Sequence, residues 1–210
     1  FGKARGKDRI LELGCATGVI SLLLALRLPE ATKIEGIDIQ EDLVNLAKRN
    51  AQENGLDARV SFFLSDLRNI KDRYASQSFD VVVTNPPYDE PHRSRWTDSF
   101  SDATARQGLY CSLKDVVKAA HFVLKNKGHL FMIFRAQRGA ELVAALVNEN
   151  LEPKRLQMVH PYPGKKATVI LVEAVRSAGK GVVIESPLYI YDGEGNFTPE
   201  LLAAYDLSKE

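Results

Sequence analysis

The fold is decided by one stretch near the start of the chain, RILEL-GCATG-VISLLLAL at residues 9–26. Residues 9–13 are predicted to form a short buried strand, residues 14–18 a tight turn, and residues 19–26 a helix that packs on a sheet. A strand, a glycine turn and a helix in this order are typical of an open α/β sheet, which binds ligands at the carboxyl ends of its strands.

The glycine turn predicts a ligand-binding loop. Glycine lets the backbone approach a ligand closely, and the start of the following helix offers unpaired N–H groups. The spacing is G-x-x-x-G, with Ala16 at the place of the middle glycine of a dinucleotide loop, so it does not predict NAD. Glu12 would repel a pyrophosphate and suits a cationic ligand such as S-adenosylmethionine, which carries an amino group and a sulfonium.

Two acidic residues follow predicted strands where a nucleoside would need acceptors. Residues 33–38 are predicted as a strand that ends in Asp38, about twenty residues past the turn, where a carboxylate can accept from both ribose hydroxyls. The alternative is that Asp38 caps the helix predicted at residues 41–54. Asp66 follows a strand at residues 60–64 and could accept from an adenine amine, with a solvated loop acid as the alternative.

A pair of prolines follows the apolar strand at residues 79–84, in Asn85-Pro86-Pro87-Tyr88. Each proline fixes its own φ and lacks an N–H, and Pro86 also keeps Asn85 extended, so the segment offers acceptors on a stiff frame. The Asn85 side-chain oxygen and the Pro86 carbonyl could accept both protons of an –NH₂ group, and Tyr88 offers a flat face for stacking. The segment therefore predicts a site for a planar amine, with an ordinary proline turn as the alternative.

The stretch between this motif and the next predicted helix is the candidate substrate loop. Residues 89–106 are polar and mix cations with one tryptophan, which suits phosphate contact and base stacking, although charge runs are often only solvated surface. The candidate substrate-binding residues are Tyr88, Arg93, Arg95, Trp96 and Arg106. Cations after later predicted strands could extend the same face, namely Arg135, Arg138, Lys165 and Lys166.

These motifs, in this order, resemble class I S-adenosylmethionine-dependent methyltransferases that modify exocyclic or amide nitrogens, over residues 9–173. Within that group the chain is similar to the bacterial tRNA(Val) adenine-N6 methyltransferase family. The similarity rests on Ala105-Arg106-Gln107, His160-Pro161, Ser186-Pro187-Leu188-Tyr189-Ile190-Tyr191 and Phe197-Thr198-Pro199-Glu200. The family usually has His-Glu where this chain has Gln107-Gly108, a difference that concerns the substrate more than the chemistry.

The resemblance implies direct methyl transfer to the exocyclic amine of an adenine in tRNA. The implied catalytic residues are Asn85, Pro86, Pro87 and Tyr88. The implied cofactor-binding residues are Glu12, Gly14, Cys15, Ala16, Gly18, Asp38, Ile39, Asp66, Leu67 and Asn85. No metal is expected, because neither cysteine has a His or Cys at zinc spacing.

Other functions fit the same motifs. A protein glutamine N5-methyltransferase would present a side-chain amide to the same acceptors, and guanine-N2 methylation of rRNA is a further alternative. A member of the fold that binds cofactor or RNA without catalysis is supported only by Ala16 and Gln107.

Composition is that of a cytoplasmic enzyme. The chain has 210 residues, enough for one sizeable core, and no apolar run approaches the roughly eighteen residues of a membrane span. Two cysteines make no disulfide framework, so both are expected to be reduced. The net charge of +1 excludes a globally basic nucleic-acid binder but not a local patch. Because the chain begins with Phe1, a preceding segment is expected.

The predicted fold is a doubly wound, Rossmann-like α/β sheet of seven strands, mostly parallel with an antiparallel edge strand. Residues 1–175 are expected to form the methyltransferase domain, and residues 176–210 an extension packed on it. The remaining predicted elements are helices at residues 113–124, 140–150 and from 199, strands at 129–134, 155–159 and 168–173, turns at 126–128 and 192–196, and a short β segment at 182–191.

Overall fold

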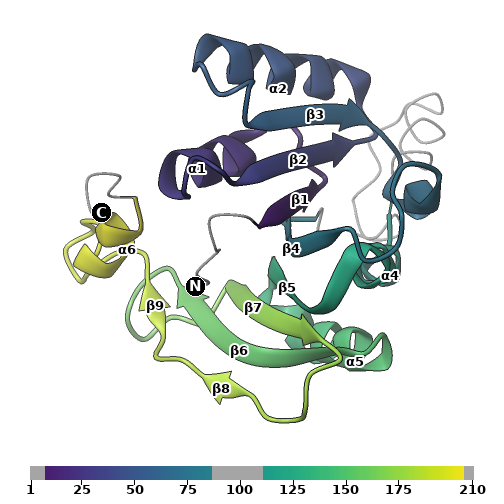
Figure 1. The fold of residues 1–210 in the computed structure, drawn as a ribbon. Helices are drawn as coiled ribbons and strands as arrows, with labels where there is room; N and C mark the ends of the chain where they lie inside the picture. The colour runs from purple at the N-terminus through teal and green to yellow at the C-terminus, as the bar shows by residue number, and fades with distance from the viewer. Residues whose placement is uncertain (1–7, 87–110, 206–210) are drawn as a thin grey trace, which may run out of the picture.

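The computed structural model describes residues 8–86 and 111–205, which form an α/β sheet with helices on both faces (Figure 1). The first half contains β1 (Arg9–Leu13), α1 (Val19–Arg27), β2 (Lys33–Asp38), α2 (Glu41–Glu53), β3 (Val60–Leu64), the 3₁₀ helix η1 (Leu67–Asp72) and β4 (Phe79–Thr84). The second contains α4 (Leu113–Val123), β5 (Leu124–Arg135), the 3₁₀ helix η2 (Ala136–Arg138), α5 (Gly139–Asn148), β6 (Leu151–His160), β7 (Val169–Arg176), β8 (Val183–Ile184), β9 (Leu188–Tyr189) and α6 (Pro199–Tyr205).

The described strands form one sheet in the order β3-β2-β1-β4-β5-β7-β6-β8, with β9 also paired to β6. The first five strands of this order are parallel, and β7 is antiparallel to both of its neighbours. The predicted fold class is confirmed, but the sheet has nine strands and not seven. The antiparallel strand also lies inside the sheet and not at its edge, because the β6–β7 hairpin folds β7 back against β5 while β8 and β9 pair with the outer side of β6.

Each face of the sheet has its own apolar core, as a doubly wound sheet requires. On one face α2 buries Val44, Ala47 and Ala51 at helical spacing in the core that also contains β1, β2 and β3 side chains. On the other face α4 and α5 pack over β4, β5 and β7. Helices therefore pack on both faces of the sheet, although the face that carries α1 stays open over part of β4, β5 and β7.

The start of β5 differs from the prediction. The sequence predicts a turn at residues 126–128, but β5 already begins at Leu124, directly after α4. Leu124 is opposite Phe79 whereas His129 is opposite Val81, so β5 carries a bulge of several residues between these two pairs. Lys127 takes a φ of 63° inside this bulge. A register shift of this kind depends on the partner strand, so local turn signals cannot distinguish it from a loop.

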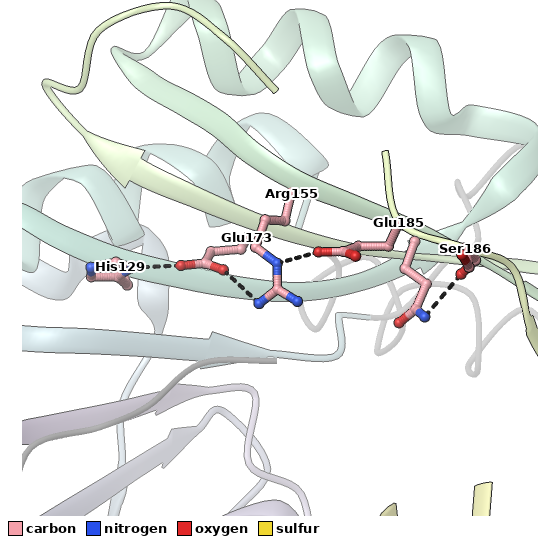
Figure 2. A network of polar contacts seen from close by, with 6 residues as sticks. His129, Arg155, Glu173, Glu185 and Ser186 are labelled. Carbon is pink, nitrogen blue, oxygen red and sulfur yellow. Dashed lines mark hydrogen bonds and ion pairs between the residues drawn. The ribbon is translucent and has the colours of Figure 1, made fainter. Parts of the chain in front are cut away.

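A network of polar contacts connects β5, β7, β6 and the tail (Figure 2). His129 Nδ1 lies 2.8 Å from a Glu173 oxygen, and Arg155 Nη1 lies 3.4 Å from the other oxygen of that carboxylate. Arg155 Nε donates to Glu185, just past β8, at 2.6 Å. Partly exposed ion pairs add little to stability. This network therefore acts mainly on the register of β5, β7, β6 and the tail, because it pairs specific residues of these segments.

Candidate active site

The strand order reverses between β1 and β4, and open α/β sheets bind ligands at such a switch point. Leu13 and Thr84, the last residues of these two strands, are register partners. The buried Thr84 hydroxyl donates to the Leu13 carbonyl oxygen at 2.9 Å. The glycine turn after Leu13 and Asn85 after Thr84 therefore leave the sheet side by side.

The glycine turn is held by the neighbouring strand β2. Gly14, Ala16 and Gly18 have φ values of 72°, 44° and 81°, so two of the three left-handed positions are glycine. The Ala16 amide donates to Asp38 Oδ2 at 2.9 Å, and the Gly14 amide donates to the Ile37 carbonyl at 2.9 Å. Bonds to the end of β2 thus compensate for a non-glycine residue at the middle of the turn.

The Phe62 ring of β3 packs against the glycine turn, a contact that the sequence did not predict. A Cβ added at Gly36 would lie 2.6 Å from the Phe62 ring and 2.9 Å from Cys15 Cβ, and a Cβ at Gly18 would also collide with this ring. Glycine at both positions therefore lets the ring pack under the turn. Cys15 is a free, buried thiol, and burial raises its pKa.

Glu12 has a structural role that its sequence position did not indicate. Its side chain is only 1% exposed and accepts hydrogen bonds from the Ser21 amide and hydroxyl in the first turn of α1. Gly18, the N-cap of α1, has no side chain that could cap the helix, so Glu12 takes its place from β1. Burial raises the pKa of Glu12 to about 7, with the Asp38 charge adding to the rise and the Ser21 hydrogen bonds opposing it. Whether Glu12 also binds a cation stays a prediction.

Asp38 stands between the turn and the first residues after β2. Its Oδ2 accepts from Ala16 and its Oδ1 accepts from the Gln40 amide, each at 2.9 Å. Gln40 is the N-cap of α2 and no side chain in the described part of the chain caps this helix, so Asp38 holds the residue before α2 but does not cap the helix itself. A carboxylate has about four lone-pair sites, which leaves room for ribose hydroxyls.

A pocket opens directly beside Asp38. It is lined by five of the predicted cofactor-binding residues and by five further residues. The predicted ones are Gly14, Asp38, Ile39, Asp66 and Leu67, and the further ones are Ile37, Gln40, Ser65, Arg68 and Cys111. Polar groups with unused acceptor sites at the carboxyl ends of β1, β2 and β3 fit the nucleoside part of S-adenosylmethionine.

Replacing Asp38 by Ala should weaken binding of S-adenosylhomocysteine by about 1.5–3 kcal/mol, because an acceptor for the ribose hydroxyls and the support of the Ala16 amide are both lost. Isothermal titration calorimetry measures the effect. Asp42→Ala, which removes an exposed carboxylate from α2, is the control and should leave the affinity unchanged. Unchanged affinity in Asp38→Ala would limit this residue to its role at the start of α2.

The Asp66 carboxylate in the pocket is paired with Arg68. Arg68 Nε lies 2.9 and 2.8 Å from the two carboxylate oxygens, and its amide donates to Oδ1 at 2.9 Å. The hydrogen bonds from Arg68 are the main cause that lowers the pKa of Asp66, so this carboxylate stays charged and can still accept. The sequence did not single out Arg68, although its place two residues after Asp66 at a helix start is the available signal.

The proposed amine-binding motif is described only in its first half. Asn85 is exposed at the end of β4, and Pro86 is buried. The other predicted catalytic and substrate-binding residues lie outside the described residues, namely Pro87, Tyr88, Arg93, Arg95, Trp96 and Arg106. Of this motif, the structure therefore describes the exposed Asn85 side chain and the backbone of Pro86.

Residues 8–86 and 111–205 contain neither a cluster of metal ligands nor a membrane-spanning helix. No group of three or more His, Cys, Asp or Glu side chains there could hold a metal ion. No helix in these ranges is long and apolar enough to cross a membrane.

The sheet order, the glycine turn and the pocket at the carboxyl ends of the strands define a Rossmann-like protein that binds a nucleoside cofactor. A family model described as "Methyltransferase domain" matches residues 5–174, and the chain belongs to this family. It is an S-adenosyl-L-methionine-dependent methyltransferase, so the predicted enzyme class and cofactor are confirmed.

Known proteins are similar to this chain in sequence or in fold. A tRNA1(Val) (adenine(37)-N6)-methyltransferase of Tolumonas auensis is 24% identical over 202 residues, which are 96% of this chain and 82% of that protein. The fold matches a predicted O-methyltransferase from Agrobacterium tumefaciens with a TM-score of 0.76 at 22% identity, over 95% of this chain and 88% of the other. It also matches a geranyl diphosphate C-methyltransferase from Streptomyces coelicolor, solved with S-adenosyl-L-homocysteine, with a TM-score of 0.62 at 15% identity, over 83% and 72%.

Proposed function

We propose that this enzyme methylates the exocyclic amine of an adenine in tRNA. The observation that carries the proposal is the position of Asn85 and Pro86, which follow β4 directly beside the glycine turn at the switch point. An amine held there is next to the cofactor pocket. Relatives over most of the chain are named tRNA1(Val) (adenine(37)-N6)-methyltransferases, which supports adenine in tRNA over the other amines that the motif fits.

The protein contributes to methyl transfer mainly by positioning the amine. S-Adenosyl-L-methionine supplies the methyl group from its sulfonium. The Asn85 side-chain oxygen and the Pro86 carbonyl accept hydrogen bonds from the two N–H groups of the amine, and this directs the nitrogen lone pair away from them. The nitrogen gains the methyl group and then loses one of these protons to solvent, which leaves S-adenosylhomocysteine as the second product. The bond between Thr84 and Leu13 keeps these acceptors at a set distance from the glycine turn. Holding the reacting atoms in line accounts for much of the rate, and no covalent enzyme intermediate is needed.

The proposed partner is RNA and the proposed location is the cytoplasm. An adenine inside a folded RNA must leave its stack before its amine can reach the site. Residues 89–106 are the proposed substrate loop and would hold the RNA backbone through their arginines. Both cysteines are free, as expected for a reducing compartment.

A methyl-transfer assay tests the function. The enzyme is incubated with labelled S-adenosylmethionine and either unmodified tRNA transcripts, rRNA or bulk protein, and the products are digested and analysed by mass spectrometry. N6-methyladenosine in tRNA is expected. N5-methylglutamine or N2-methylguanosine as the product would replace the proposal by one of the two alternatives, and absence of any transfer would favour a non-catalytic member of the fold.

A further inference from the structure

Three aromatic rings stack on one another where the tail meets the carboxyl end of β6. The Tyr162 and Tyr191 ring centroids lie 5.1 Å apart at an interplanar angle of 27°, and those of Tyr191 and Phe197 lie 5.2 Å apart at 17°. The rings come from the β6–β7 connection, from the residues after β9 and from the far side of the tail's turn. Beside them the His160 ring packs against Tyr189 with centroids 5.5 Å apart.

The two outer rings of this aromatic stack remain accessible. Tyr162 is 38% exposed and Phe197 is 52% exposed, although each has one ring face against Tyr191. Tyr191, which carries the middle ring, also holds the tail through its backbone, because its amide donates to the Pro161 carbonyl at 2.9 Å. Anchoring the tail does not require open outer rings, so their exposure points to a second role.

Two lysines without carboxylate partners lie in the same connection. Lys165 and Lys166 are exposed, and neither forms an ion pair with any carboxylate in the described part of the chain. Their loop is well held, since His160 Nδ1 lies 2.6 Å from the Lys165 carbonyl and the Lys165 amide donates to Tyr162 at 3.1 Å. The nearest acid in sequence to the stack, Asp192, accepts three hydrogen bonds within its own turn.

The aromatic stack is at the same end of the sheet as the active site but outside it. Register pairs across β5 and β7 place Leu156 of β6 level with Thr84 of β4. His160 lies beyond that level, toward the carboxyl end, and β6 is three strand positions from β4, roughly 15 Å at the usual strand spacing. Figure 1 shows β9 beside β6, at the edge of the sheet opposite β3 and α2. A ligand of the stack is therefore separate from the reacting adenine.

We propose that Tyr162, Phe197, Lys165 and Lys166 form a second RNA contact, which binds unpaired nucleotides flanking the methylated adenine. The proposal rests on the proposed function for the identity of the RNA. Exposed ring faces accept any base by stacking, and unpaired lysines attract the phosphates between bases. Aromatic faces beside cations suit a single strand better than a regular duplex, whose bases stack only on one another.

The first test uses the double variant Tyr162→Ala/Phe197→Ala. Its Kd for fluorescein-labelled unmodified tRNA, measured by anisotropy, and its KM for tRNA should both rise about tenfold to a hundredfold, the range expected for lost base stacking. Its kcat at saturating tRNA and its affinity for S-adenosylhomocysteine should stay within about twofold, because the stack touches neither the cofactor nor the reacting amine. Tyr162→Phe/Phe197→Tyr should retain wild-type values. Leu46→Ala on α2, where the side chain is 38% exposed like that of Tyr162, is the control for loss of an exposed apolar group.

The second test is independent of ring packing. Lys165→Gln/Lys166→Gln changes only exposed side chains, so the variant should fold normally. The slope of log Kd for tRNA against log salt concentration should decrease by about 0.7 for each lost phosphate contact. Unchanged tRNA affinity and unchanged salt dependence in the two double variants would overturn the proposal even if the enzyme methylates tRNA. Binding measured by anisotropy does not require turnover. A loss of RNA affinity in these variants would therefore support the contact even if the methylated product proved to be a protein.

Discussion

Asn85→Ala should lower kcat for tRNA about a hundredfold to a thousandfold, a much larger effect than its effect on cofactor binding. The side-chain oxygen of Asn85 is one of two acceptors for the amine, and it follows a strand end that the Thr84–Leu13 bond fixes beside the glycine turn. Without it one amine proton is unpaired and the nitrogen moves off the line of transfer. Losing one preorganised polar contact at a reacting centre raises a barrier by about 2.7–4 kcal/mol.

Single-turnover kinetics and calorimetry with S-adenosylhomocysteine separate the two effects. Asn69→Ala, at an exposed position of η1, is the matched asparagine control and should be fully active. Asn85→Ala with undiminished turnover would show that the motif does not bind the amine. So would a product methylated on a ring carbon or a ring nitrogen.

Glu12 should make the enzyme less stable as the pH rises from about 4.5 to 7. Its pKa is raised from 4.5 to about 7 in the folded chain, mainly by burial. Between these values the folded state binds more protons than the unfolded state, so the free energy of unfolding falls as the pH increases. The stabilisation is complete below pH 4.5 and lost above about pH 7, and the difference between the two pKa values corresponds to about 3 kcal/mol.

Glu12→Gln tests this linkage, because glutamine keeps an acceptor for the Ser21 amide but does not titrate. Urea unfolding at pH 5.0, 6.0 and 7.5 should show a smaller loss of stability with pH in the variant than in the wild type. Glu53→Gln, which removes an exposed carboxylate at the end of α2, should keep the wild-type slope. The same slope in Glu12→Gln and the wild type would mean that Glu12 is already ionised at low pH.

Much of the site could be predicted from local signals. A glycine turn and a proline pair restrict the backbone within a few residues, and strands that alternate with helices align their carboxyl ends at one edge of a sheet. Gly14, Asp38 and Asp66 were predicted on this basis, Ile39 and Leu67 from the family resemblance, and the structure brings all five to one pocket. Their roles in binding and catalysis stay predictions, as do those of Tyr88 and the substrate loop.

The sequence by itself determined the fold class, the side of the sheet where the predicted cofactor-binding residues meet, and most element boundaries. These features depend on periodicity and backbone restriction over short distances. Only the tertiary structure decided that β7 lies between β5 and β6, that Glu12 caps α1 and that Phe62 packs under the glycine turn. Tyr162, Tyr191 and Phe197 likewise meet only when the tail pairs with β6. Each of these contacts depends on how separate elements pack in three dimensions, and no local preference of the chain specifies that packing.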